Sequence, residues 1–275
     1  MNEMTRAGIL ISSAAAATVL ALSGPAAVSA APGPAFTVMT YNIASAVETA
    51  NDLDPIADTI EREDPDVVGL QEVDRSWSRS DSLDQAGQLA ARLGMFSSFD
   101  PNLDCSALDF DADGTCEYGT AILSRRRIRA SATRQYTLPR RGTDEPRGLA
   151  QVGITIAGRR VTLFNTHLSV PRAGHAPQIR SIVQVLAHTR GPYVVTGDFN
   201  TPPNAPELRV LRARAVDAAR LMQVRRPTVG TTRVDYVFVS KDIAVVRARV
   251  PRPAARRVSD HRPLIVRLRL GGSGG

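Results

Sequence analysis

The chain has 275 residues, a formal net charge of +7 and two cysteines. Its length fits one large α/β domain and leaves little room for a second. Aromatic residues make up only 5% of the chain, which argues against a surface that stacks bases along single-stranded nucleic acid. Nearly all of the basic residues are arginine, a bias that GC-rich coding also produces, so the charge is a weak indication of an anionic partner.

The first thirty residues predict a secretory signal peptide. Arg6 precedes an apolar run at 8–22, and small residues follow up to a cleavage position near Ala30. The run is too short to span a bilayer, which takes about 20 apolar residues, and no later stretch is longer. We therefore expect a secreted monomer with no transmembrane segment in the mature chain, one domain over residues 31–270 and a flexible tail at 271–275.

The cysteines, Cys105 and Cys116, predict one disulfide that closes a short loop, since an exported chain meets oxidising conditions. A zinc site needs four ligands, and no nearby His or Cys pair supplies them. Within this loop, the stretch Asp109–Asp113 resembles the start of a calcium-binding EF-hand loop, but Thr120 stands where a bidentate Glu is needed. An acidic turn is the simpler interpretation, and calcium binding stays open.

Strand-like and helix-like segments then alternate, which is typical of a layered α/β domain. Several neighbouring strands have no helix between them, so part of the sheet must be antiparallel. We expect a four-layer α/β/β/α sandwich with two packed mixed β-sheets and helices outside. The predicted strands are 36–41, 67–70, 119–123, 129–136, 149–156, 161–165, 193–197, 234–240, 243–250 and 263–270, and the predicted helices are 54–62, 84–93 and 177–188.

Polar clusters follow the apolar strands, and this is the strongest functional pattern in the sequence. Each cluster alone would fit a turn or a helix cap. Six of them, each at the end or start of a strand, indicate an active site at the rim of a sheet. The clusters are Asn42, Gln71-Glu72, Asn165-Thr166-His167, Gly197-Asp198-Phe199-Asn200, Asp235 and Ser259-Asp260-His261.

With these clusters the chain resembles the endonuclease/exonuclease/phosphatase superfamily, which includes deoxyribonuclease I and inositol polyphosphate 5-phosphatases. The matching segments occur in the family's order over nearly the whole mature chain. They are MTYNI, GLQEVD, YGTAILSR, FNTHLS, VTGDFN, VDYVFVS and SDHRPL. A further stretch with Arg79 and Asp84-Gln85 is similar to the branch associated with remodelling of glycosylphosphatidylinositol lipids.

The resemblance implies a Mg²⁺ site, with Mn²⁺ as an alternative ion. Hydrolysis of a phosphodiester needs neutralised phosphoryl oxygens and an aligned water, and Mg²⁺ prefers hard oxygen ligands. By this resemblance Glu72 is the principal metal ligand, and Asn42 and Asp260 complete or polarise the site.

The resemblance also implies catalytic roles. His261 would hydrogen-bond the scissile phosphate and Asp235 would orient it, because adjacent pairing of their strands would bring both side chains to one rim. Asp198 would position or deprotonate the attacking water. Asn200 would hold that water or a phosphate oxygen, and His167 would act as a second phosphate-facing histidine and general acid. Supporting positions are Glu117 or Tyr118 beside His167, and the outer residues Arg147 and Asn165.

We therefore expect a divalent-metal-dependent phosphodiesterase that acts by in-line attack of water. Its substrate is open between extracellular nucleic acid, as for a deoxyribonuclease I-like endonuclease, and an anionic phospholipid or glycolipid headgroup. The headgroup is favoured because no long basic insertion is present to grip a duplex. A catalytically inactive binding module of the same fold would show substituted ligands or a substituted His–Asp pair, and neither is seen.

Overall fold

The structure is a computed structural model that describes Met1 and residues 33–104, 116–252 and 257–271. Residues 1–31 and 32–275 form separate units, and the second unit contains the folded domain. The expected signal peptide beyond Met1, Cys105, the acidic stretch 109–113 and the tail beyond Gly271 lie outside the described residues. Among the described helices, none is both long enough and apolar enough to cross a membrane.

Two six-stranded sheets form the centre of the domain, in the orders β11-β12-β1-β2-β4-β3 and β5-β6-β7-β8-β10-β9. Each sheet contains one parallel pair, β1 with β2 and β7 with β8, and its other neighbours are antiparallel. The strands β1 to β12 are, in order, Ala35–Asn42, Val67–Arg75, Phe96–Asp104, Glu117–Ser124, Arg129–Thr137, Gly148–Ile156, Arg159–His167, Tyr193–Asp198, Val216–Asp217, Asp235–Val239, Ile243–Arg249 and Leu264–Leu270.

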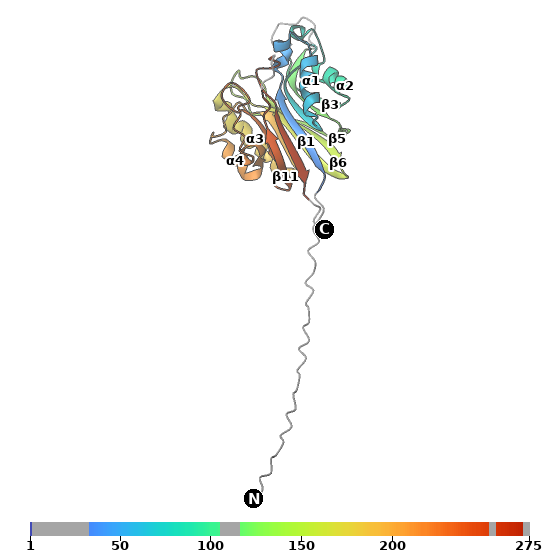
Figure 1. Ribbon diagram of the computed structural model, residues 1–275. Helices are drawn as coiled ribbons and strands as arrows, with labels where there is room; N and C mark the ends of the chain where they lie inside the picture. Colours follow the sequence, from blue (N-terminus) through green and yellow to red (C-terminus); the bar gives the residue numbers. More distant parts are fainter. Residues whose placement is uncertain (2–32, 105–115, 253–256, 272–275) are drawn as a thin grey trace. The chain divides into compact units, whose positions relative to one another are not determined.

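Helices cover the outer face of each sheet. The helices α1 and α2 pack on the first sheet, and α3 and α4 pack on the second (Figure 1). The α-helices α1 to α5 are Asp54–Glu63, Gln85–Leu93, His175–His188, Leu208–Arg214 and Ala218–Leu221, and the 3₁₀ turns η1, η2 and η4 are Ala44–Thr49, Ser78–Ser80 and Arg172–Gly174. The expected four-layer α/β/β/α arrangement is therefore confirmed.

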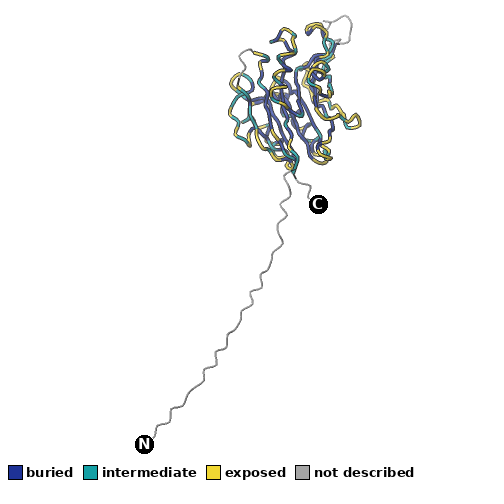
Figure 2. The backbone as a smooth tube through the Cα atoms, turned by 45° about the vertical axis from the view of Figure 1, so that its right-hand side comes forward, coloured by how far each residue is buried: buried dark blue, intermediate teal, exposed yellow. Residues whose placement is uncertain are grey.

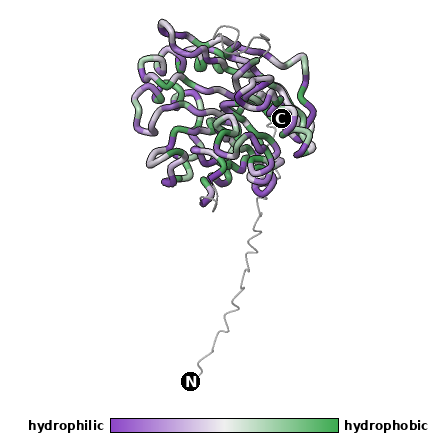
Figure 3. The backbone as a smooth tube through the Cα atoms, turned by 90° about the horizontal axis from the view of Figure 1, so that it is seen from above, coloured by the Kyte–Doolittle hydropathy of each residue, from purple (hydrophilic) through white to green (hydrophobic). Residues whose placement is uncertain are grey.

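The apolar core has three layers, as four packed layers of backbone require. The middle layer joins the inner faces of the two sheets, for example through Val38 and Val152, and the outer layers seal α1 and α2 or α3 and α4 against their sheets. Burial therefore follows the central strands, while exposed residues are concentrated in loops, on outer helix faces and on the edge strand β5 (Figure 2). Viewed from above, hydrophilic stretches are concentrated toward the periphery (Figure 3).

Two strands were not predicted, and one predicted pairing was wrong. The strand β3, with sequence FSSFDPNLD, is polar and contains Pro101. Proline is tolerated there because β3 is an edge strand that pairs only with β4. The two-residue strand β9 is too short to leave a pattern. The wrong pairing is that of β10, which begins with Asp235, and β12, which follows His261. These strands were expected to be neighbours in one sheet, but they lie in different sheets.

Candidate active site

The polar strand ends meet at one rim of the sandwich. In each parallel pair the carboxyl ends of both strands point to the same edge, so β1 with β2 and β7 with β8 deliver their last residues there. Because β10 runs antiparallel to β8, it begins at that edge, and Asp235 stands opposite Asp198 in the register. The topology thus brings together residues that are up to 219 positions apart in sequence, from Asn42 to His261 (261 minus 42).

Glu72 projects from a β-bulge. The register of β2 with β4 shifts between Gln71 and Val73, so Glu72 is the extra residue, and its φ of +54° lies in the left-handed region. A bulge redirects a side chain that a regular strand would place on one of its two faces. A non-glycine residue in this conformation costs on the order of 1–3 kcal/mol, a strain that is concentrated at functional sites. The fold therefore holds this carboxylate at the rim at the expense of local stability.

Asn42 joins Glu72 to the second carboxylate of the site. Its Nδ2 donates to Oε1 of Glu72 at 2.8 Å and to Oδ2 of Asp198 at 3.1 Å. Its Oδ1 accepts a hydrogen bond from the backbone N–H of Ala44 at 3.0 Å, and the side chain is fully buried. This geometry makes Asn42 a positioning residue for both carboxylates, and its predicted role as a metal ligand stays a prediction.

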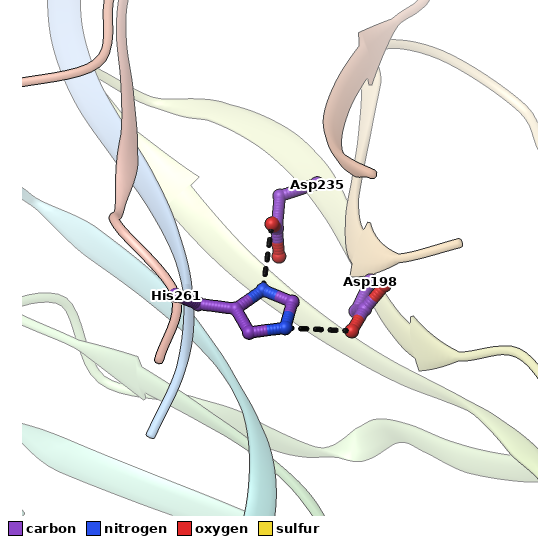
Figure 4. Close-up of side chains that lie close together, drawn as sticks. All are labelled: Asp198, Asp235 and His261. Carbon is purple, nitrogen blue, oxygen red and sulfur yellow. Dashed lines mark hydrogen bonds and ion pairs between the residues drawn. The ribbon is translucent and has the colours of Figure 1, made fainter. Parts of the chain in front are cut away.

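His261 lies between two aspartates (Figure 4). Its Nδ1 is 2.8 Å from Oδ2 of Asp235, and its Nε2 is 3.6 Å from Oδ2 of Asp198. Burial alone would lower the pKa of His261, but Asp235, Asp198 and Asp260 oppose it and raise the pKa to about 9. The ring is therefore an imidazolium at neutral pH, with Asp235 fixing its orientation.

Asp198 is almost fully buried, and burial is the main cause of its raised pKa, with repulsion from Asp235 second. Three groups oppose that rise. These are the charge of His261, the backbone N–H of Asn200, which lies 2.8 Å from Oδ1, and the amide of Asn42. A carboxylate with a pKa raised toward neutrality is suited to accept a proton from water.

His167 has a different environment. Its Nδ1 lies 3.1 Å from Nη1 of Arg147, and its Nε2 lies 3.0 Å from Nδ2 of Asn200. Its pKa is held well below the ordinary value, first by burial and then by the charges of Arg147 and His261. Arg147 can only donate, so Nδ1 of His167 is the acceptor, and the single ring proton lies on Nε2, which is 3.6 Å from Oδ2 of Asp198. The ring is neutral, which disfavours the expected general-acid role and favours phosphate positioning.

The four residues predicted to support the site lie in different parts of it. Glu117 does not contact His167, because it forms an ion pair with Arg75 along β2 and β4. Arg147 occupies the position beside His167 and is held by Glu145 at 2.8 Å. Tyr118 lines a pocket next to Glu72. Asn165 lies beneath the site and bridges the two sheets.

The contacts of Ser259 and Arg79 were not predicted from the sequence. Ser259 Oγ donates to the carbonyl of Asn42 at 2.7 Å and accepts from the backbone N–H of His261 at 3.1 Å, which ties the two predicted clusters together. Arg79 makes a two-point ion pair with the fully buried Asp74, at 2.8 and 2.7 Å. Only the spacing of the two charges in QEVDRSWSR could have indicated that pair.

Carboxylates at the site fit a hard divalent cation. Glu72 and Asp260 both line the pocket at the rim, and oxygen donors of this kind suit Mg²⁺ or Mn²⁺. Asp198, Asp235 and His261 also offer three ligand atoms within 4.8 Å of one another. A protonated His261 has no lone pair for a metal, so this second group is better suited to hold water and phosphate.

Hydrolysis of a phosphate ester needs charge stabilisation around the phosphoryl oxygens and a positioned water, and this rim offers residues for both. The profile of the Endonuclease/Exonuclease/phosphatase family matches residues 39–261. The chain therefore belongs to this family of phosphate ester hydrolases. The more specific resemblance to the branch associated with glycosylphosphatidylinositol remodelling stays a prediction.

Solved structures of the family share the fold. A family protein from Beutenbergia cavernae DSM 12333 superimposes with a TM-score of 0.68 at 27% identity, over 87% of this chain and 72% of that one. A family protein from Bacteroides vulgatus has a TM-score of 0.70 at 18% identity, over 86% and 99%. A mannosyl-6-phosphatase from Bacteroides thetaiotaomicron has a TM-score of 0.65 at 18% identity, over 85% and 99%. No curated protein shows significant sequence similarity to the chain.

Proposed function

We propose that this protein is an exported, divalent-metal-dependent phosphodiesterase that uses Mg²⁺, or Mn²⁺ in its place. Family membership supplies the reaction class. The observation that carries the metal dependence is Glu72, a carboxylate held at the rim on a strained bulge and hydrogen-bonded by Asn42. Export rests on the signal-like first thirty residues alone.

The proposed metal site consists of Glu72 with Asp260, and Asn42 holds Glu72 in place. A bound divalent cation would neutralise charge on the phosphoryl oxygens and polarise the ester. The other two carboxylates of the site each bind protein groups. Asp235 is committed to His261, and Asp198 accepts hydrogen bonds from Asn42 and from the backbone of Asn200.

The remaining residues align the water and stabilise the phosphate. Asp198 holds the attacking water and accepts its proton, since its raised pKa makes it a better base than an exposed aspartate. The imidazolium of His261 donates a hydrogen bond to a phosphoryl oxygen as negative charge develops there. Asn200 and the neutral His167, which lie 3.0 Å apart, hold the phosphate from the second sheet.

The test is Glu72→Gln, which removes the charge at nearly constant shape. We expect loss of metal-dependent hydrolysis of bis(p-nitrophenyl) phosphate with an unchanged melting temperature. Glu61→Gln is the matched control, because Glu61 lies on the exposed side of α1, where its side chain is 60% exposed. Activity that survives both Glu72→Gln and excess EDTA would refute metal dependence.

An endonuclease is the second candidate, and one feature favours it. A hollow of about 440 Å³ adjoins His261 and Asp260, and four arginines line it, Arg62, Arg252, Arg257 and Arg262. Arginines beside a scissile phosphate could hold flanking phosphates of a nucleic acid strand. Nicking of plasmid DNA that weakens steeply with salt and is reduced by Arg62→Gln would support this candidate.

A further inference from the structure

The pocket that Glu72 and Asp260 line has further polar walls beyond these two carboxylates. It has a volume of about 320 Å³, near the lower end of the roughly 300–1,000 Å³ typical of small-molecule sites. Its walls come from η1, from the segment after β2, from the start of β4 and from the segment before β6, and they include Glu48, Trp77, Arg79, Tyr118 and Glu145. A pocket of this size next to the proposed metal ligands would receive a compact group bonded to the scissile phosphate.

The charge of the pocket selects against a second phosphate. Glu48, Glu72, Glu145 and Asp260 line it, and Arg79 is the one basic residue among the lining residues. The metal and the scissile phosphate would use Glu72 and Asp260. Glu48 and Glu145 would then face the rest of the substrate, and their carboxylates would repel a second phosphate.

Arg79 is a fixed hydrogen-bond donor in this wall. Its Nε and Nη2 bind the buried Asp74, its Nη2 also lies 3.3 Å from Ser45 Oγ, and its guanidinium carbon lies 3.5 Å from the centre of the Trp77 ring. None of the described residues accepts a hydrogen bond from Nη1, and the side chain remains 42% exposed. The guanidinium is therefore held rigid with donor capacity left for a ligand.

The carboxylates of the wall complement that donor. Oε1 of Glu48 lies 3.1 Å from Arg257, and Oε1 of Glu145 lies 2.8 Å from Arg147, so each carboxylate is anchored through one oxygen. The second oxygen of each can accept a hydrogen bond from a hydroxyl group. Fixed acceptors on one side and a fixed donor on the other match vicinal hydroxyls, which both donate and accept.

The aromatic residues do not form a platform for a nucleobase. Trp77 and Tyr118 are both 8% exposed and meet edge to face, with ring centres 6.3 Å apart. Arg79 already covers a face of the Trp77 ring. Base stacking needs an open ring face, so these rings shape the floor of the pocket and do not hold a base.

We propose that this pocket binds a neutral polyhydroxylated group, a sugar or polyol ring, esterified to the scissile phosphate. The proposal rests on the proposed phosphodiesterase function and narrows its substrate class. The same chemistry occurs in a soluble glycerophospho-polyol and in a glycolipid or phosphoinositide headgroup, so the experiment has an arm for each source.

The experiment compares steady-state kinetics with Mg²⁺ on four substrates: glycerophosphoinositol, vesicles of phosphatidylinositol in phosphatidylcholine, a DNA oligonucleotide and bis(p-nitrophenyl) phosphate. For Glu48→Gln we expect KM for the two inositol substrates to rise about tenfold, as loss of one charge-assisted hydrogen bond predicts. Hydrolysis of bis(p-nitrophenyl) phosphate should stay within about twofold. The matched control Glu61→Gln, outside the pocket, should change neither value.

The second variant is Arg79→Gln. Because it leaves the buried Asp74 without its ion-pair partner, a melting curve must show that the variant is folded. We expect a similar rise in KM for inositol substrates. Preference for soluble or vesicle substrate identifies the source of the headgroup. Equal losses on all substrates, or DNA cleavage that exceeds inositol turnover and improves in Glu48→Gln, would overturn the proposal. If the wild-type protein is inactive on all four substrates, the proposed function is refuted. The pocket is then tested by calorimetry, in which glycerophosphoinositol should bind to the Glu72→Gln protein.

Discussion

His261 and Asp235 form a hydrogen-bonded pair across the two sheets, with Nδ1 and Oδ2 2.8 Å apart. Asp235 begins β10 in the second sheet, and His261 stands just before β12 in the first. Since each sheet contributes one partner, the pair is correctly formed only when the sandwich is closed. Orientation of the ring, and its charge, are thereby linked to the packing of the whole domain.

The two residues should act as one unit in catalysis. We expect His261→Ala to lower kcat by about a thousandfold, since it removes a stabiliser of transition-state charge. Adding Asp235→Asn to that variant should cost little more, because Asp235 acts through the ring that is already gone. The measurement is a double-mutant cycle with bis(p-nitrophenyl) phosphate. Log losses of the single variants that simply add in the double variant would show that the residues act independently.

Activity should fall in alkaline solution as His261 loses its proton. Its pKa is raised to about 9, so the imidazolium persists at neutral pH and disappears as the pH rises through that value. Removing the carboxylate partner with Asp235→Asn should move this alkaline limb toward neutral pH. The pH dependence of kcat/KM between about pH 5 and 10 reports the limb. An unchanged limb in Asp235→Asn would contradict the assignment.

Asp198 should govern the acid limb. Burial raises its pKa, so the base is protonated and activity is lost as the pH falls below the neutral range. The folded protein holds this proton at a pH where the unfolded chain has released it, so ionisation destabilises the fold as the pH rises. Asp198→Asn should therefore lower kcat by about a hundredfold or more while the melting temperature at pH 8 stays equal or rises. A large drop in that temperature would contradict this account.

Asn165 should matter for stability. Its Nδ2 donates to the carbonyls of Leu70 and Ala121 at 2.7 and 3.0 Å, and its Oδ1 accepts from Gln71 and Thr196 at 2.7 and 3.0 Å. Asn165→Ala would leave these buried groups unpaired, and we expect a loss of about 2–4 kcal/mol in the free energy of unfolding. Urea denaturation measures it, with Asn204→Ala as the control because Asn204 is exposed. A loss no greater than that of the control would argue against the bridge.

The disulfide between Cys105 and Cys116 stays a prediction, because Cys105 lies outside the described residues. Cys116 itself is buried and packs with Trp77 and Tyr118. Bonding should contribute roughly 2–3 kcal/mol to stability by constraining the unfolded chain. Thiol titration of the unreduced, unfolded protein should find no free thiol, and two free thiols would refute the pairing.

The sequence predicted a strand and its functional residues correctly where both lie in one continuous segment. The strands β1 and β8 are apolar runs that end in polar residues, so both they and their functional ends were predicted. Arg147 could not be placed beside His167 from the sequence, because that contact depends on how β6 and β7 meet in space. Strand β3 was missed for the opposite reason, since its edge position requires little apolar surface.

Glu72 is a single inserted residue in an otherwise regular ladder. Gln71 pairs with Thr120 and Val73 with Gly119, so the strands on both sides of Glu72 already follow adjacent partners. Deletion of Glu72 would leave β2 and β4 in uninterrupted register and would remove the strain of the bulge. If Glu72 holds the proposed metal, one in-frame deletion would therefore remove the activity and relieve the backbone strain at the same time.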